Sequence, residues 1–286
     1  MEKEYLEVNF INDDELVKDK YLWKYLDLHK FLYFLFKKSL YLTRLDKFED
    51  RREGISSNQL LLKHFKRRVD NHPTFDTIRQ FMEVDTLGLE MNQNEDKLRI
   101  IQRFNFASCW VVGENLSESA AMWNLYSNPN SVAIKIKYSD FKENFLLEKI
   151  ESGVFQKEII CSPVKYLDFQ SERKLSEQDG NLTDTTFIKD SSFGHEKEFR
   201  IVMKENERQI KSIEHNAGIS RKHIENLYNF TYDYAGIPIP LNNFENYNFE
   251  IIHHPKSDQW AKHNIGQILN KFEINFKVSD SNLELK

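Results

Sequence analysis

Apolar residues recur along the chain with two periods, one of which predicts strands and the other helices. The period of two is cleanest in residues 131–138, where Val132, Ile134 and Ile136 lie on one face of the predicted strand. Large apolar groups also alternate around Lys24 in residues 21–27. The other segments predicted as strands are residues 39–45, 104–112, 154–160, 162–169, 198–204, 236–241, 249–254 and 275–281.

Helical periodicity follows a capping residue at three places. Asp27, Ser117 and Ser257 each precede a helical pattern, and their side-chain oxygens can accept the free N–H groups of a first turn. These caps predict three helices that start at residues 28, 118 and 258. The apolar stripes expected to face the core are Leu28, Phe31, Leu32, Leu35 and Phe36 in the first helix and Trp260, Ile265 and Leu269 in the last.

The order of these elements divides the chain into three regions. Residues 1–56 open with a short helical stretch and continue with strand, helix and strand, whereas residues 57–103 are polar and helical and predict an insertion. Residues 104–286 alternate strands with short helices, except that residues 171–190 have no period and predict a mobile loop. We expect one α+β domain over residues 1–286, with short, mostly antiparallel strands in a split or strongly twisted sheet and with peripheral helices.

Composition excludes several classes of protein. Aromatic residues make up 13% of the 286 positions, an apolar load that intrinsically disordered chains lack. No apolar run is long enough to cross a membrane, and the acidic start is unlike a secretory signal. Cys109 and Cys161 cannot form a disulfide framework, so we expect reduced thiols and a cytoplasmic location. The net charge of −5 gives no global nucleic-acid signature.

Six short blocks, which occur in the right order, resemble a known family. The main block is similar to "S-C-W…S…M-W…Y" and comprises Ala107-Ser108-Cys109-Trp110, Glu118-Ser119, Met122-Trp123 and Tyr126. The others are Trp23-Lys24-Tyr25, residues 48–54, Ser131-Val132-Ala133-Ile134, Val164-Lys165-Tyr166, and Phe193 with Glu196, Glu198 and Arg200. The family is the DUF2971 family of uncharacterised proteins, so the resemblance implies a fold and site candidates but no activity. Leu26 stands where the family usually has arginine, and Lys24 or Arg44 could replace part of that anion-binding role.

The strongest chemical candidate is the pair Glu196 and Glu198 with Arg200. On a strand these side chains point to one face, where two adjacent carboxylates raise at least one pKa and the arginine keeps the other ionised. Such pairs perform general acid–base chemistry or stabilise a developing cation. The alternative is a solvated strand face with ladder salt bridges. Asp50 and Glu53, in the charged loop after residues 39–45, could present two more acids into a cleft or form a charged turn.

Polar and aromatic residues at the start of the third region form another candidate group. Ser108 and Trp110 share a strand face, where Ser108 could orient a ligand and Trp110 could stack on a flat ring. Trp123 and Tyr126 lie side by side on the following helix, either in the core or in a ligand-binding box. Cys109 has no histidine near it in sequence that could activate it as a nucleophile. The histidines show no metal-ligand spacing, so no metal is expected.

The first of three possible functions is an enzyme that resembles arginine-targeting ADP-ribosyltransferases. Those enzymes have a basic residue on an early strand, then a serine-led strand, then an E-x-E motif. The corresponding residues here are Lys24 or Arg44, then Ser108, then Glu196 and Glu198. The resemblance implies that the basic residue holds the pyrophosphate of NAD, that Glu198 stabilises the ribose cation and that Glu196 assists the nucleophile of a protein or nucleic-acid acceptor. The resemblance also implies that an aromatic residue such as Tyr25 or Trp110 stacks on nicotinamide.

The other two functions belong to different classes. Asp50, Glu53, Glu196 and Glu198 could form an acidic cluster that binds a divalent cation and cleaves a nucleotide or phosphodiester, which requires the four carboxylates to converge. Alternatively, an aromatic-rich cleft could bind a small molecule or peptide without catalysis. The lead expectation is a nucleotide-type ligand with NAD as substrate and no membrane partner. A role in bacterial toxicity or phage defence is an association only.

Overall fold

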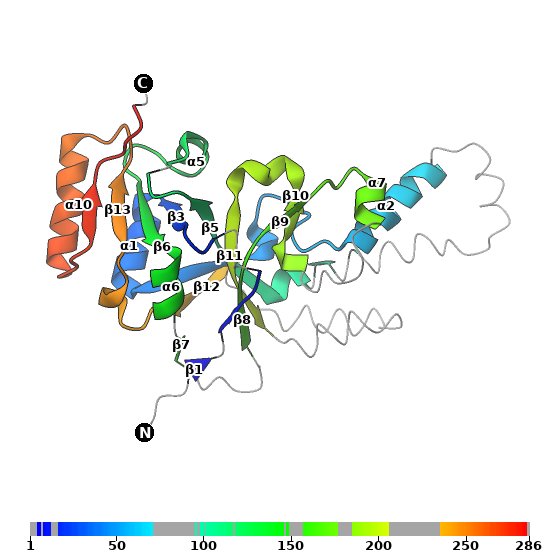
Figure 1. Cartoon of the computed structure of the whole chain (residues 1–286), viewed down its shortest axis with the longest axis horizontal. Helices are drawn as coiled ribbons and strands as arrows, with labels where there is room; N and C mark the ends of the chain where they lie inside the picture. Colours follow the sequence, from blue (N-terminus) through cyan, green and yellow to red (C-terminus); the bar gives the residue numbers. More distant parts are fainter. Residues whose placement is uncertain are drawn as a thin grey trace.

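An open, mostly antiparallel β-sheet forms the middle of the protein (Figure 1). The computed structural model describes residues 5–6, 8–12, 17–70, 95, 98–99, 101–116, 118–145, 147–148, 157–176, 185–205 and 235–284. Together with the helices around the sheet, this arrangement confirms the predicted α+β class.

The large sheet joins strands from distant parts of the chain. Its order is β14-β13-β6-β3-β5-β11-β8-β2, and β4 pairs with both β5 and β12. Only the pairs β2–β8 and β13–β14 of this sheet are parallel within the described residues. Its strands are β2 (Val8–Phe10), β3 (Tyr21–Leu26), β4 (Ser39–Arg44), β5 (Asn105–Gly113), β6 (Val132–Lys137), β8 (Lys157–Pro163), β11 (Glu198–Glu205), β12 (Gly236–Pro240), β13 (Glu250–His253) and β14 (Lys277–Ser279). Two small sheets pair β1 (Tyr5–Leu6) with β7 (Leu147–Glu148) and β9 (Lys165–Leu167) with β10 (Ile188–Asp190).

One face of the sheet, which we call the first face, carries the main apolar core. Ile134, Phe199 and Ile201 belong to this core, together with residues of three helices that cover the face. Its aromatic rings pack closely, as in the stacked pair Phe141 and Phe145 with centroids 4.7 Å apart. The helices are α1 (Leu28–Lys37), α6 (Tyr138–Asn144) and α10 (Gln259–Lys271).

The opposite side, which we call the second face, packs against shorter elements. Trp123 of α5 (Ala120–Tyr126) lies against Trp23 and Tyr25 of β3. Farther along the same face, Phe187 packs with Val202 of β11. The remaining elements are α2 (Ser57–Asp70), α7 (Glu172–Ser176) and the 3-10 helices η1 (Leu45–Lys47), η2 (Thr185–Phe187), η3 (Ser191–Glu196) and η4 (Phe244–Asn246). Helices α2 and α7 lie together at the end of the molecule far from α10 (Figure 1).

Several local predictions need correction. The first residues do not form a helix where they are described, because Val8–Phe10 extends the sheet as β2 beside β8. The segment 171–190, predicted as a loop, contains α7, η2 and β10 among its described residues. The helix expected after Ser117 is instead capped by Ser119, whose hydroxyl accepts the N–H of Met122; Ser117 lies outside the described residues.

The core-facing stripes of two helices also differ from the prediction. In α1 the buried residues are Phe31, Phe34 and Leu35, whereas Phe36 is exposed and meets Phe272 edge-on. In α10, Trp260 in the first turn is exposed. The N-cap position of α10 is Asp258 rather than Ser257, and its side chain makes no capping hydrogen bond. The buried residues of α10 are Ala261, Ile265 and Leu269. The predicted insertion at 57–103 is helical at residues 57–70, 95, 98–99 and 101–103, and its other residues lie outside the described set.

Both cysteines are free thiols, in agreement with the absence of a disulfide framework. Among the described residues, no helix is both long enough and apolar enough to cross a membrane.

Alanine substitutions at two glycines test the packing, because they should change the free energy of unfolding in opposite directions. Gly266 lies inside α10 with open space at its Cβ position, so Gly266→Ala should raise the free energy of unfolding by about 1 kcal/mol through helix propensity. A Cβ on Gly236 would lie 2.3 Å from the carbonyl oxygen of Leu42 on the paired strand, so Gly236→Ala should lower the free energy of unfolding by roughly 1–3 kcal/mol. Urea unfolding of both variants measures these changes, and stabilisation by Gly236→Ala would contradict the β4–β12 pairing.

Candidate active site

Strand register places Glu198 and Arg200 on the second face. Arg200 lies opposite Cys109 of β5, and Glu198 lies opposite Val111, so their side chains point away from the core that holds Phe199. Glu198 is the first residue of β11, and Arg200 is fully buried two residues later. The period of two therefore holds for this part of the E-x-E-x-R motif.

Glu196 reaches the same place by a different route. It is the last residue of η3 and not part of the strand, which corrects the expectation that all three charged side chains share one strand face. Between them, Lys197 adopts the left-handed conformation with φ 43° and ψ 52°. This single residue reverses the chain so that the carboxyl groups of Glu196 and Glu198 meet at one lysine. The site thus depends on a backbone conformation that lysine rarely adopts.

Arg200 is the centre of a buried set of ion pairs. Its Nε donates to Glu198 Oε2 over 2.6 Å, and its two terminal nitrogens donate to both oxygens of Glu53 over 2.7 and 3.0 Å. One of them also donates to the carbonyl oxygen of Thr186 over 2.7 Å. Glu53 comes from the turn before α2 and is 1% exposed. The guanidinium is therefore neutralised by carboxylates from segments about 150 residues apart in the chain.

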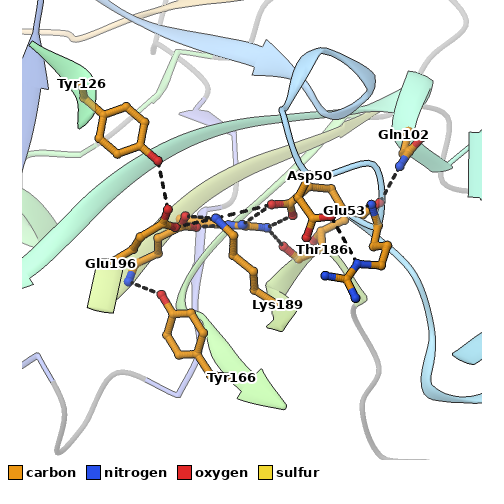
Figure 2. Close-up of polar contacts among 11 residues, drawn as sticks. Asp50, Glu53, Gln102, Tyr126, Tyr166, Thr186, Lys189 and Glu196 are labelled. Atoms are coloured by element: carbon orange, nitrogen blue, oxygen red, sulfur yellow. Dashed lines mark hydrogen bonds and ion pairs between the residues drawn. The ribbon is translucent and has the colours of Figure 1, made fainter. Parts of the chain in front are cut away.

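Lys189 of β10 completes this set. Its Nζ donates to Glu196 over 2.5 Å and to Glu198 over 2.8 Å, and it lies 3.7 Å from Glu53. We call Glu53, Lys189, Glu196, Glu198 and Arg200 the ion-pair cluster. Figure 2 shows Lys189 beside Glu196 at its centre. Sequence reasoning missed Lys189 because it lies in the segment expected to be a loop; the apolar pair Phe187-Ile188 directly before it was the available signal of a short buried strand.

The ion-pair cluster contains one more acid than base. Three carboxyl groups face two cations, so full ionisation leaves one negative charge in excess. Burial raises the pKa of Glu196, and the hydrogen bond to the Glu198 carboxyl raises it further. Burial also acts to raise the pKa of Glu198, but Arg200 and Lys189 hold it well below its ordinary range. Glu198 thus stays ionised, while Glu196 is the group that takes up a proton.

Two tyrosines lie on either side of the carboxyl pair (Figure 2). The hydroxyl of Tyr126, the last residue of α5, donates to Glu196 Oε1 over 2.9 Å, and 46% of its surface is exposed. The hydroxyl of Tyr166 accepts the backbone N–H of Glu198 over 2.8 Å. Burial raises the pKa of Tyr126, and the neighbouring Glu196 raises it further, so the phenol keeps its proton. Tyr126 is therefore the solvent-accessible end of the site.

One predicted catalytic residue, Ser108, and three predicted ligand residues lie on the other side of the sheet. Lys24 is paired with Ile134 and Ser108 with Ile201, and both of those isoleucines belong to the core of the first face. Trp110 is also in this core and is 1% exposed. Arg44, opposite Phe106 in the register, is held by Asp46 through two hydrogen bonds. The thickness of the sheet separates these residues from Glu198, so they do not line one cleft with it.

The other predicted residues on the second face have packing roles. Tyr25 meets Trp123 edge-on at 4.8 Å, and its hydroxyl accepts the N–H of Ser119. Trp123 is fully buried and donates its indole N–H to Glu118. Asp50, whose side chain is 9% exposed, accepts the backbone N–H of Arg52 over 2.9 Å. The contacts of Tyr25 and Trp123 hold α5, which carries Tyr126, against β3.

The arrangement does not favour a divalent cation. The described residues contain no grouping of three or more histidine, cysteine or acidic side chains that could hold a metal ion. Glu53, Glu196 and Glu198 do converge, but the ammonium of Lys189 lies among them. Cys109 on the same face is unsuited as a nucleophile, because burial raises the pKa of its thiol to about 12.

Comparison with known proteins identifies no relative. No family model matches the chain. No curated protein and no solved structure matches it either. The resemblance to the DUF2971 family stays a prediction.

The conformation of Lys197 can be tested by stability measurements. Lys197→Gly should raise the free energy of unfolding by about 1 kcal/mol, because glycine adopts the left-handed region without a steric penalty. Lys197→Val should lower it, because a β-branched residue is disfavoured there. Lys37→Gly, in an exposed position at the end of α1, is the matched control and should be destabilising. Equal effects of glycine at both positions would contradict the left-handed turn.

The pH dependence of stability tests the ionised state of Glu198. Because its folded pKa is below the ordinary 4.5, this carboxylate contributes stability at pH values above 4.5, and the contribution is lost as the pH falls through the folded pKa. Glu198→Gln should lower the free energy of unfolding by about 3–5 kcal/mol at neutral pH, since it leaves buried cations without their partner. The difference in free energy of unfolding between Glu198→Gln and the parent protein should become smaller below pH 4.5. The control is Glu245→Gln, which removes an exposed ion pair with Lys38 and should change the free energy of unfolding little.

Proposed function

We propose that this protein is an enzyme that breaks the N-glycosidic bond of NAD and passes the ADP-ribosyl group to water or to a nucleophile of an acceptor. One observation carries the proposal. Glu196 and Glu198 meet in one buried cluster with pKa values shifted in opposite directions, upward for Glu196 and downward for Glu198. Two carboxyl groups with pKa values driven apart by their surroundings are the pattern of an acid–base pair with divided roles.

This division of roles fits the chemistry of the bond. When the bond between C1′ of the ribose and the nicotinamide nitrogen breaks, the electron pair goes to the nitrogen and positive charge develops on the ribose. A carboxylate that stays ionised, as Glu198 does, stabilises this charge. The attacking oxygen then forms a bond to C1′ and gives its proton to Glu196, whose raised pKa makes it a stronger base than an ordinary carboxylate.

The other residues of the ion-pair cluster position the two acids. Lys189 donates to both of them, and Arg200 fixes Glu198 against Glu53. Tyr126 holds Glu196 from the exposed side. The ring of Phe193 of η3 also lies against this group, with its centroid 4.5 Å from the ammonium of Lys189. Phe193 and Tyr126 are therefore the rings we assign to contact the nicotinamide.

The proposal differs in one respect from the resemblance to ADP-ribosyltransferases. Lys24, Ser108 and Trp110 lie on the first face of the sheet, so they are not assigned to the pyrophosphate or to nicotinamide. The assignment to NAD therefore depends on the two glutamates and not on the complete order of motifs. No contact of the described residues favours the metal-dependent alternative.

The test measures nicotinamide release from NAD by the purified protein, with and without a chelator. Glu196→Gln should lower the rate about 10²–10⁴-fold, because it removes the base, while folding is preserved because it removes the excess negative charge. The rate of the parent protein should rise as the pH increases through the pKa of Glu196, and Glu196→Gln should lose this dependence. Tyr126→Phe should shift the rising part to higher pH, since the carboxylate loses a hydrogen-bond donor.

Two control variants separate catalysis from stability. Glu250→Gln removes another carboxylate that is bound to a buried lysine, Lys135, far from the E-x-E motif. Tyr41→Phe removes the hydroxyl of a similarly exposed tyrosine on β4. Both should leave nicotinamide release unchanged. Release that is unaffected by Glu196→Gln would refute the proposal, and NAD binding without turnover by the parent protein would assign the site to a binding module instead.

A further inference from the structure

On the first face of the sheet, Lys24 carries a charge for which the described part of the chain supplies no carboxylate. Its Nζ donates to the hydroxyl of Ser108 over 3.0 Å and to the carbonyl oxygen of Cys109 over 2.9 Å, both of which are neutral acceptors. The ammonium also lies 5.5 Å from the centre of the Trp110 ring. The other lysines that are buried in the sheet region, Lys135 and Lys189, each contact a carboxylate. A buried cation without a counter-charge is costly, so Lys24 needs an explanation.

The same place has more hydrogen-bond donors than acceptors. An ammonium has three N–H groups, and Lys24 uses two of them within the described residues. The Ser108 hydroxyl accepts from Lys24, and the described residues provide no acceptor for its own proton. The indole N–H of Trp110 is buried and has no hydrogen-bond partner. Three neighbouring residues therefore each have a donor to spare, and an anionic oxygen is the group that would satisfy them.

Ser108 and Trp110 are each 1% exposed, and Lys24 is the least buried residue of the three. Lys24 belongs to β3, which ends at Leu26, and α1 begins at Leu28 and covers the same face. The location between β3, β5 and α1 is distinct from the ion-pair cluster, which occupies the second face.

We propose that Lys24, Ser108 and Trp110 form a binding site for an oxyanion, a sulfate- or phosphate-like group or a carboxylate, on the first face of the sheet. This site is separate from the proposed NAD site, because its residues lie on the opposite face of the sheet from Glu196 and Glu198. The anion supplies the counter-charge to Lys24 and accepts a hydrogen bond from it and from the serine.

The state of Lys24 without a ligand agrees with this site. Burial lowers the pKa of Lys24 to about 8, and Lys30 of α1 lowers it further, whereas Cys109 of β5 and Glu198 of β11 act to raise it. A bound anion favours the charged amine, so binding should be strongest below pH 8. Above that pH the affinity should fall about tenfold per pH unit, because a proton must be taken up with the anion.

The experiment titrates the full-length protein with sodium sulfate, whose charge is constant between pH 6 and pH 9, and follows binding by calorimetry. A parallel titration with sodium acetate distinguishes a tetrahedral anion from a planar carboxylate, and sodium chloride at equal ionic strength is the background. We expect one site per chain that saturates with sulfate or with acetate. The affinity for that anion should fall about tenfold per pH unit above pH 8.

Three variants connect the binding to these residues. Lys24→Met should abolish saturable binding and should keep or raise the melting temperature, because it removes a charge without a partner. Ser108→Ala should weaken binding without loss of folding. Lys135→Met, at a lysine already neutralised by Glu250, should lower the melting temperature and leave anion binding unchanged. Unchanged binding in Lys24→Met, a pH-independent affinity, or the absence of saturable binding of both anions would overturn the proposal.

Discussion

The fully buried guanidinium of Arg200 is the constraint on which the second face of the molecule depends. A charge without exposure to water must be neutralised within the protein. Of the groups that bind Arg200, only Glu198 is close to it in sequence, whereas Glu53 and Thr186 come from distant segments. The bond to Glu53 holds the loop before α2 against the sheet, and the bond to the carbonyl oxygen of Thr186 holds the segment before β10 there. Lys189 then follows Thr186 into the same cluster. The position of the whole polar layer is thus set by one side chain on β11.

The alternation of side chains along the strands explains why the order of motifs in the chain does not describe the site. Ser108 and Cys109 are consecutive on β5, yet one hydroxyl faces Lys24 and the other side chain lies opposite Arg200. Residues that are adjacent in sequence, and that resemble one motif there, are divided between the two faces of the sheet. Only the register of neighbouring strands decides the division, and a single sequence contains little information about register.

This distinction also explains how much of the structure the sequence predicts. Strands such as β3, β5, β6 and β11 follow directly from apolar alternation, because each has one face in the core. Of the ion-pair cluster, Glu53, Glu196, Glu198 and Arg200 are identifiable as candidates from residue type and spacing. Lys189 is not, because a three-residue strand within a polar segment has too few positions to show a period. The left-handed Lys197 is equally hidden, since lysine gives no signal of that conformation.

The two faces have opposite imbalances of charge across a single sheet. The ion-pair cluster has one carboxyl group more than its cations neutralise, and Lys24 has a cation without a carboxylate among the described residues. The two are not isolated from each other, because Glu198 is one of the charges that raise the pKa of Lys24. Loss of the charge on Glu198 would therefore make the ammonium of Lys24 harder to maintain and would weaken its hold on an anion. By reciprocity, an oxyanion that keeps Lys24 charged would favour the ionised state of Glu198, so the ionisation of one face and the occupancy of the other are coupled.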